Sequence, residues 1–360
     1  MGDTRPGPAM IGRLGGTGAN KPRIEHAYER TRVLYVAGTG RSGSTLLAAV
    51  LGQLEGFFNA GEIRYVWDRG LIQNRLCGCG NRFHECATWQ SILEEAFGSE
   101  GVDAATMSRL QAELTRVRHL RGLAAAGARS GRPEVDRYLA DLASLYAAIA
   151  KLTGSRVIVD SSKLPSYGRL LSRLPSVDLF VIHLVRDPRA AAGSWAGLKA
   201  QPDRGVPGYM ETMSPARSAL LWTFWNSTAR RLMAVPPERY VRLRYEDFVA
   251  EPQAAIARIV SKLGIDPTSV TSPFQDSSTV VLTPNHTVAG NPDRLKSGAV
   301  KIQSAAAARK GLKGRDRAIV TLMAMPLLAS YRYRLRATGE PEPAPIGIQH
   351  LPGPLRAPPP

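Results

Sequence analysis

Four segments of the chain are predicted to form strands. They are Arg32–Gly40, Arg156–Asp160, Val177–Val185 and Arg239–Phe248. The third, VDLFVIHLV, is apolar along nearly its whole length, which is typical of a parallel strand that is covered on both faces. The first ends in glycines, the pattern of a strand that enters a loop.

Helix-forming segments lie between these strands. Ser44–Leu54 follows the first strand with its apolar positions on one face, and Ser214–Val235 begins with a Ser-Pro pair typical of helix starts. Helical patterns also fill about residues 89–152. Strands that alternate with helices predict an α/β fold of the P-loop type, with helices on both faces of a mostly parallel sheet. We expect a single domain with a helical insertion at about 89–152 and a ligand site at the carboxyl ends of the strands.

The two ends of the chain differ in composition from the region between them. Residues 1–31 are rich in Gly, Pro and charge and are predicted to form a flexible leader, and residues 338–360 a Pro-rich disordered tail. The domain is expected to span 32–337. No apolar run is long enough to span a membrane, and the start of the chain lacks a signal-peptide core. Three cysteines are too few for a disulfide scaffold, so a cytoplasmic location is expected.

Charge narrows the choice of partner. The 360 residues include 47 Lys and Arg against 30 Asp and Glu, which gives a formal net charge of +17 at pH 7. The hydrophobic content of 44% excludes a long disordered chain. A basic balance favours nucleic acid, an anionic membrane surface or a small polyanionic cofactor. A basic solvated surface without a specific ligand is the alternative.

The segment Gly38–Thr45 (GTGRSGST) lies between the first strand and its following helix. In that context the loop amides and the helix N-terminus converge and can bind an anion. The segment nearly fits the nucleotide-binding loop GxxxxGK[ST], but Ser44 stands at the lysine position and the cation of the loop is Arg41. The missing lysine counts against an ordinary ATPase or GTPase. The alternative is that the glycines only shape a tight turn.

A second candidate anion site, Leu184–Trp195 (LVRDPRAAAGSW), directly follows the third strand. Arg186 lies at the strand end, and Ser194 lies in a helix predicted to begin near Pro188. The two side chains could converge on a second phosphate group. Taken alone, an Arg-Asp pair that caps a helix is equally a structural feature.

Together the two segments resemble the phosphate-binding segments of sulfotransferases that use 3′-phosphoadenosine-5′-phosphosulfate (PAPS). Five further segments come in the order found in tyrosylprotein-type and bacterial members of that superfamily: GEIR (Gly61–Arg64), DSSK (Asp160–Lys163), WTFWN (Trp222–Asn226), RYEDF (Arg244–Phe248) and HTVAGNPDR (His286–Arg294). The resemblance covers about residues 32–335. It implies an enzyme that transfers the sulfuryl group from PAPS to a hydroxyl group.

The resemblance also implies which residues hold the donor. In the family the first loop binds the 5′-phosphosulfate, which here implies Arg41, Ser42, Gly43, Ser44 and Thr45, with Arg41 where many members have lysine. The 3′-phosphate would be gripped by Arg186 and Ser194, and further nucleotide contacts are implied for Tyr245, Gly290 and Arg294. A core position at the end of a strand is the alternative for Tyr245.

For the chemistry, the resemblance implies two residues. Glu62 matches the glutamate that takes the acceptor's proton in tyrosylprotein-type members, and Lys163 matches their lysine near the bridging oxygen. Animal-type cytosolic members use a histidine as the base, and His286 is the only loop histidine near a motif, whereas His183 is expected in the core. The structural alternatives are a turn cap for Glu62 and a surface position for Lys163. The mechanism requires no metal.

The segment Leu76–Trp89 (LCGCGNRFHECATW) contains His84 and all three cysteines, Cys77, Cys79 and Cys86. These four side chains could form a Cys3His metal set, but a CxC followed by a six-residue gap differs from the paired CxxC spacing of zinc sites. A disulfide or a packed hairpin beside the acceptor pocket is favoured, and no metal site is expected.

Two other functions compete with sulfuryl transfer. A P-loop small-molecule kinase is disfavoured by Ser44 in place of lysine and by the pair of Arg186 and Ser194. A basic nucleic-acid-binding protein is disfavoured because the chain lacks the usual aromatic-basic interleaving, so no nucleic-acid partner is expected. The acceptor stays open among small-molecule, glycan, lipid and peptide hydroxyls, as do peripheral membrane contact and oligomeric state.

Overall fold

The computed structural model describes residues 30–116, 132–204, 207–233, 235–303, 312 and 314–334. The predicted leader, apart from residues 30 and 31, and the whole predicted tail at 338–360 lie outside the described residues. Part of the predicted helical insertion, residues 117–131, lies outside them as well.

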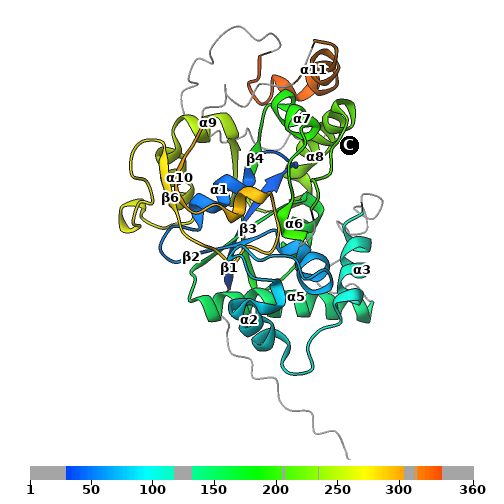
Figure 1. Cartoon of the computed structure of the whole chain (residues 1–360), viewed down its shortest axis with the longest axis vertical. Helices are drawn as coiled ribbons and strands as arrows, with labels where there is room; N and C mark the ends of the chain where they lie inside the picture. The colour runs from blue at the N-terminus through cyan, green and yellow to red at the C-terminus, as the bar shows by residue number, and fades with distance from the viewer. Residues whose placement is uncertain are drawn as a thin grey trace, which may run out of the picture.

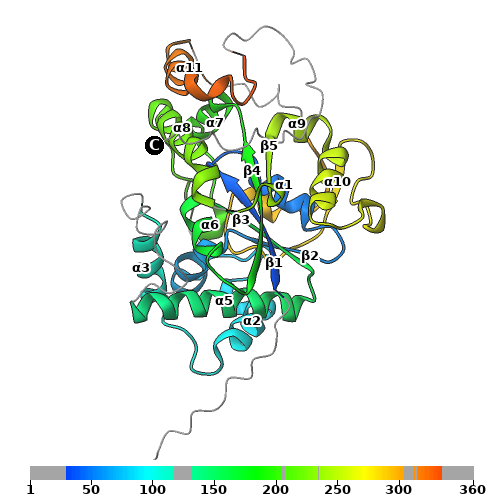
Figure 2. The same ribbon diagram turned by 180° about the vertical axis from the view of Figure 1, so that it is seen from behind.

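A five-stranded parallel sheet forms the centre of the molecule (Figures 1 and 2), with the strand order β2-β3-β1-β4-β5. The strands are β1 (Thr31–Gly38), β2 (Phe57–Gly61), β3 (Val157–Lys163), β4 (Val177–Val185) and β5 (Tyr240–Arg244). The sheet confirms the predicted α/β class. Two details differ from the prediction. The edge strand β2 was not expected, and β5 ends at Arg244 because the next residues begin a helix.

Helices cover both faces of this sheet, since side chains of β1 point alternately to two apolar clusters. Val33, Tyr35 and Ala37 face the cluster that includes α2, α5 and α6, and Leu34 and Val36 face the cluster that includes α1, α9 and α10. Alternation of this kind is what a strand buried on both faces requires. The helix bounds are α1 (Ser44–Leu51), α2 (Ala87–Phe97), α5 (Pro133–Thr153), α6 (Pro165–Leu171), α9 (Tyr245–Ala250) and α10 (Pro252–Lys262).

The remaining helices gather near the two ends of the molecule (Figure 1). At one end α7 (Pro188–Ala196), α8 (Pro215–Met233) and α11 (Gly314–Leu328) pack together, and at the other α3 (Ala104–Leu114) packs near α5. A small antiparallel pair, β6 (Thr279–Leu282) and β7 (Gly298–Lys301), lies beside α1. Short helical turns complete the described chain at Ile63–Tyr65, Val66–Ile72, Phe83–Glu85, Pro202–Arg204, Pro237–Arg239, Pro267–Ser269 and Pro292–Leu295.

The sheet places the two predicted anion-binding segments side by side. β1 lies between β3 and β4, and Gly38 at its end pairs with Leu184 of β4. Gly38 has a φ of +146°, and a Cβ there would lie 2.4 Å from the Leu184 carbonyl oxygen. Only glycine therefore allows the loop after β1 to leave the sheet so close to the end of β4.

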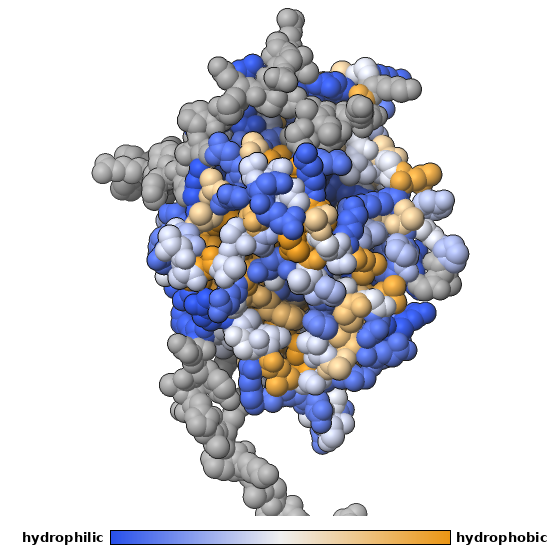
Figure 3. Space-filling model, turned by 60° about the vertical axis from the view of Figure 1, so that its left-hand side comes forward, coloured by the Kyte–Doolittle hydropathy of each residue, from blue (hydrophilic) through white to orange (hydrophobic). Residues whose placement is uncertain are grey.

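The surface is mixed in character. Figure 3 shows the left-hand side of Figure 1, where hydrophilic residues surround smaller hydrophobic patches. In the described part of the chain, every helix is too short or too polar to cross a membrane.

Candidate functional site

A cleft of about 580 Å³ lies at the carboxyl ends of β1, β3 and β4 and receives both predicted anion-binding segments. Its walls carry many cationic side chains, namely Arg41, Arg64, Arg69, Lys163, Arg186, Lys199, Lys296 and Lys301. The acidic side chains among its described lining residues are Glu62 and Asp293. This balance suits a ligand that carries several negative charges.

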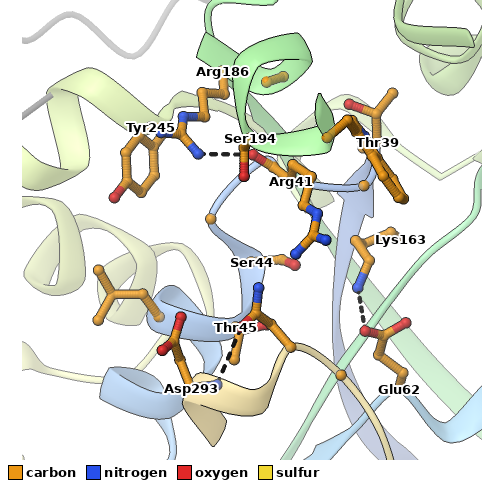
Figure 4. A pocket seen from close by; sticks show the side chains of 18 of the residues that line it. Thr39, Arg41, Ser44, Thr45, Glu62, Lys163, Arg186, Ser194, Tyr245 and Asp293 are labelled. Atoms are coloured by element: carbon orange, nitrogen blue, oxygen red, sulfur yellow. Dashed lines mark hydrogen bonds and ion pairs between the residues drawn. The ribbon is translucent and has the colours of Figure 1, made fainter. Parts of the chain in front are cut away.

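The loop between β1 and α1 forms one wall of the cleft (Figure 4). Gly43 has a φ of +91°, and a Cβ there would lie 2.3 Å from the ring of Tyr245, so the loop needs glycine at this position. The first turn of α1 has no side-chain cap, and both Ser44 and Thr45 line the cleft. The amides of this turn are therefore available to an anion.

Arg41 is the cation of this loop and is only partly satisfied by its neighbours. Its guanidinium lies 4.8 Å from the Trp195 ring, and Nη1 lies 3.3 Å from Sδ of Met210. Its Nε and Nη2 atoms are buried and have no hydrogen-bond partner among the described residues. Burial lowers the pKa of Arg41, and the carboxylates of Asp293 and Glu62 oppose that shift. An anionic ligand would supply the missing acceptors.

Ser42 lies in the same loop but differs from its neighbours. Its side chain is almost fully buried, its Oγ has no hydrogen-bond partner in the described chain, and it is not part of the cleft lining. The structure therefore brings Arg41, Gly43, Ser44 and Thr45 to the cleft, whereas the Ser42 side chain points elsewhere.

Arg186 lies at the other end of the cleft from Glu62 (Figure 4). It donates from Nη1 to the Arg41 carbonyl oxygen at 3.0 Å, and its guanidinium lies 4.7 Å from the Tyr245 ring centre. Ser194, from α7, also lines the cleft. Arg186, Ser194 and Tyr245 therefore place a cation, a hydroxyl and an aromatic ring along the same part of the cleft (Figure 4).

The segments WTFWN and RYEDF also supply contacts that hold Arg186 and the residue after it in place. Trp222 of WTFWN donates its indole N–H to the Arg186 carbonyl oxygen at 2.9 Å. Glu246 of RYEDF accepts from the Asp187 amide at 3.0 Å and from the Tyr333 hydroxyl at 2.8 Å. Burial raises the pKa of Glu246 despite these hydrogen bonds. These contacts fix the turn that follows β4.

Glu62 and Lys163 form an ion pair in the wall of the cleft, with Nζ 2.6 Å from Oε1. Their side chains are 9% and 16% exposed, respectively, so both groups are largely removed from water. Burial by itself raises the pKa of Glu62, but the charges of Lys163, Arg69 and Arg64 outweigh it and hold that pKa below its ordinary value. Glu62 is therefore a carboxylate at neutral pH.

A hydrogen-bonded network around Asp160 supports this ion pair, and Asp160 was not assigned to the site from the sequence. Asp160 is fully buried and accepts from the Ser162 amide and hydroxyl and from the Tyr146 hydroxyl. The Ser162 hydroxyl oxygen in turn accepts from the Arg64 amide at 3.0 Å. Burial raises the pKa of Asp160 to about 6. The DSSK segment thus ties the end of β3 to the segment that carries Glu62.

The loop that contains His286–Arg294, the late loop, contributes less to the cleft than the sequence suggested. Gly290 lines it, with a φ of +143° and a Cβ position 3.4 Å from Oε1 of Glu62. Arg294, in contrast, does not line the cleft. Its buried guanidinium pairs with Asp203 at 3.3 Å and donates to the carbonyl oxygens of Leu76 and Thr287. The structure assigns Arg294 a structural contact in place of the predicted nucleotide contact.

The two histidines considered as bases, His183 and His286, both lie outside the cleft lining. His183 lies in β4 and is buried between Asn226 and Tyr240, as expected of a core residue. His286 is absent from the cleft lining and faces Cys86 and Thr88 at 3.3 Å each. Its geometry therefore does not support the role of an alternative base.

Comparison with known proteins identifies the family. A model of the sulfotransferase family matches residues 34–269, well over half of the chain. The chain belongs to the sulfotransferase family. This confirms the resemblance found in the sequence, and with it the assignment of the chain to the transferases. A search of curated proteins found no match.

Solved structures of sulfotransferases are similar to the chain at low identity. The sulfotransferase domain of a Synechococcus olefin synthase is 20% identical, with 87% of this chain and 98% of that chain covered and a TM-score of 0.42. The sulfotransferase domain from the curacin biosynthetic pathway is 17% identical, with 84% and 98% covered and a TM-score of 0.45. The sulfotransferase STF9 of Mycobacterium avium is 16% identical, with 65% and 64% covered and a TM-score of 0.34.

Proposed function

We propose that the protein transfers the sulfuryl group of PAPS to a hydroxyl group of an acceptor. The proposal rests on four groups that line one cleft. A helix N-terminus, a half-buried arginine with two unpaired nitrogens and a second arginine against an aromatic ring lie there with a largely buried Glu62–Lys163 pair. The first three groups suit a donor with anionic groups at both ends, and the pair suits the chemistry between donor and acceptor.

The donor's phosphosulfate would bind at the start of α1. The amides of Ser44 and Thr45 and the free guanidinium nitrogens of Arg41 are the groups that would hold its oxygens. Since sulfuryl transfer resembles phosphoryl transfer in spreading charge over equatorial oxygens, such fixed donors stabilise the transition state without reorganising. This loop would thus both bind the donor and lower the barrier.

The 3′-phosphate would bind at the far end of the cleft. Arg186 is held there by the Arg41 carbonyl oxygen and by Tyr245, and Ser194 offers a hydroxyl. PAPS carries this phosphate and ATP does not, so the pair would decide which nucleotide binds. Lys199 and Lys296 lie on the same cleft but are paired with Asp293 at 2.5 and 2.8 Å, which leaves less of their charge for the donor.

The proton and the leaving group would be handled by the ion pair. As the acceptor oxygen forms its bond to sulfur, its proton passes to the Glu62 carboxylate. As the bond from sulfur to the bridging oxygen breaks, the Lys163 ammonium stabilises the charge that develops on that oxygen. Movement of the ammonium toward the bridging oxygen would weaken its pairing with Glu62 and so raise the pKa of Glu62 when a proton must be accepted.

Binding experiments can separate this proposal from the alternatives. Adenosine 3′,5′-bisphosphate, the nucleotide product, should raise the melting temperature of the protein more than ATP at the same concentration, and duplex DNA should have no comparable effect. A larger shift with ATP would support a kinase, and a shift with DNA alone would support a nucleic-acid-binding protein. Activity then requires a screen of hydroxyl acceptors with sulfur-labelled PAPS.

A further inference from the structure

Three thiols and one imidazole meet beside the cleft, outside its lining. Cys77, Cys79, Cys86 and His286 each offer one ligand atom, and these four atoms all lie within 4.8 Å of one another. The cysteines come from one loop and the histidine from a loop 200 residues further along the chain. The fourth member is therefore His286, whereas His84, the sequence neighbour, is exposed and faces the Leu71 carbonyl oxygen.

Two of the distances between these atoms match those between ligands around one tetrahedral ion. With Zn–S bonds of about 2.3 Å, two sulfurs of a tetrahedral zinc site lie about 3.8 Å apart, and a sulfur and a nitrogen about 3.5 Å apart. The distance from Cys79 Sγ to Cys86 Sγ is 3.8 Å, and that from Cys86 Sγ to His286 Nδ1 is 3.3 Å. The set of three sulfurs and one nitrogen is also a known donor set for structural zinc.

The surroundings of the imidazole fit a metal ligand as well. Its Nδ1 faces the cysteines, and its Nε2 lies 3.3 Å from the Thr88 hydroxyl, which can accept the N–H. A ligating histidine commonly donates its other ring nitrogen in this way, which fixes the tautomer and the ring. The backbone of His286 is held too, because the Trp89 indole donates to its carbonyl oxygen at 2.7 Å.

The cysteine loop is shaped to bring its sulfurs together. The Cys77 amide donates to the Asn81 carbonyl oxygen at 2.8 Å, and the Gly80 amide donates to the Cys77 carbonyl oxygen at 3.0 Å, which closes a tight turn around Cys79. Gly78 brings the loop against the late loop, since a Cβ there would lie 2.0 Å from Oδ1 of Asn285. The three sulfurs are brought together by a tight turn, and the histidine comes from a loop that is distant in the sequence. The spacing of the cysteines alone therefore did not indicate the site.

We infer that Cys77, Cys79, Cys86 and His286 bind a structural zinc ion. All four coordination positions would be filled by the protein, so the ion would have no catalytic water. It would join the loop that carries the cysteines to the loop that carries Gly290 and Asn291, which line the donor cleft. The prediction from sequence that the chain has no metal site is therefore replaced by this proposal.

A disulfide between Cys79 and Cys86 is the competing explanation. Its S–S bond would be about 2.0 Å long, whereas the two sulfurs lie 3.8 Å apart. It would also leave Cys77 and His286 gathered at the same point without a common partner. Zinc accounts for all four side chains.

The decisive measurement is the metal content of the full-length protein, purified without metal additives and dialysed against a weak chelator. Elemental analysis should give about one zinc per chain in the wild type. The variants Cys86→Ser and His286→Ala should lose most of it, whereas His84→Ala, a matched change in the same loop, should retain it. The assay uses no sulfuryl donor, so it can fail or succeed independently of the proposed enzymatic function.

A second measurement on the wild type keeps the proposal testable if a variant does not fold. Replacement of zinc by Co²⁺ should give the intense visible absorption of tetrahedral cobalt bound to thiolates, and a mercurial reagent should release the metal as it titrates three thiols. Removal of the metal should also speed amide hydrogen exchange at residues 285–295. A wild type without metal, a different metal as the resident ion, or a disulfide seen by mass spectrometry would overturn the proposal.

Discussion

The ammonium of Lys163 lies 2.6 Å from the carboxylate of Glu62, in a wall of the cleft where both side chains are mostly buried. Lys163 also has a φ of +68°, a conformation that costs free energy for any residue with a side chain. Its Nζ donates to the Ser161 carbonyl oxygen at 3.1 Å as well. A strained lysine held against a buried carboxylate is a typical arrangement of an active site, and it makes the pair the first target for mutation.

Glu62→Gln should abolish most of the activity and leave donor binding nearly unchanged. Glutamine keeps the size of the side chain but cannot accept the proton of the acceptor. We expect kcat to fall by roughly 10²–10⁴ while the affinity for adenosine 3′,5′-bisphosphate changes by only a few-fold. The measurements are steady-state kinetics with labelled PAPS and calorimetric titration with the bisphosphate.

Glu94→Gln, an exposed change on α2, is the control for that experiment and should behave as the wild type. A Glu62→Gln enzyme that turns over at the wild-type rate would show that Glu62 is not the base. His286 would not replace it, because its ring faces Cys86 and Thr88 instead of the cleft.

Arg186→Ala should weaken binding of only those nucleotides that carry a 3′-phosphate. Loss of a charge-assisted hydrogen bond to that phosphate typically costs ~2–5 kcal/mol. Binding of PAPS and adenosine 3′,5′-bisphosphate should fall accordingly, and binding of adenosine 5′-phosphosulfate should change little. Arg217→Ala, an exposed arginine of α8, serves as the matched control. Equal losses for all three nucleotides would mean that Arg186 only supports the Arg41 loop through its hydrogen bond to the Arg41 carbonyl oxygen.

Local patterns in the sequence were sufficient to predict the centre of the fold. β4 has the predicted bounds, and β1 and α1 lie where the apolar run and the glycine-rich loop indicated. The buried strands and the glycine-rich loop depend on near neighbours in the chain. A buried strand needs consecutive apolar residues, and a loop with positive φ angles needs glycine at particular positions. The strand β2 escaped notice because Phe57–Gly61 is short and ends in a glycine, and only its pairing with β3 makes it a strand.

Side-chain partners that lie far apart in the sequence could not be predicted in the same way. Arg294 was expected to contact the nucleotide, but its guanidinium forms a buried ion pair with Asp203. Asp203 lies in a segment with no recognised pattern in the sequence. His286 likewise meets a cysteine that lies 200 residues away. Contacts of this kind depend on how distant loops pack together, and local sequence patterns do not predict that packing.

Arg294→Ala should destabilise the fold without removing the nucleotide site. The Arg294 and Asp203 side chains are each 2% exposed, and loss of one partner leaves the other charge buried. The expected loss is ~3–5 kcal/mol in the free energy of unfolding, measured by urea denaturation. Folded protein should still bind adenosine 3′,5′-bisphosphate with nearly unchanged affinity.

Lys296→Ala is the matched control for this change, since Lys296 lies two residues away and its pair with Asp293 is exposed. Its cost should stay within about 1 kcal/mol. A variant Arg294→Ala of normal stability that no longer bound the bisphosphate would instead support the nucleotide contact that the sequence suggested.

The stability of the protein should depend on pH through the buried imidazole of His183. This ring is buried in β4, with Nε2 2.8 Å from Oδ1 of Asn226 and Nδ1 2.7 Å from the Tyr240 hydroxyl. Burial lowers the pKa of His183 to about 4, and the nearby charge of Arg242 acts in the same direction. The folded state therefore holds the ring neutral, whereas in the unfolded chain it is protonated below a pH of about 6.5.

Because the pKa is lower in the folded state, the contribution of His183 to stability is lost as pH falls from about 6.5 to about 4, by up to about 3 kcal/mol. His183→Gln should be less stable than the wild type at pH 7, since it disturbs both hydrogen bonds, but it has no ring to protonate. The difference in unfolding free energy between the two proteins should thus shrink as the pH is lowered from 7 to 4.5. Asp160, whose raised pKa acts in the opposite direction, is present in both proteins and cancels in the comparison. A difference that stayed constant over this range would show that His183 is not held neutral by burial.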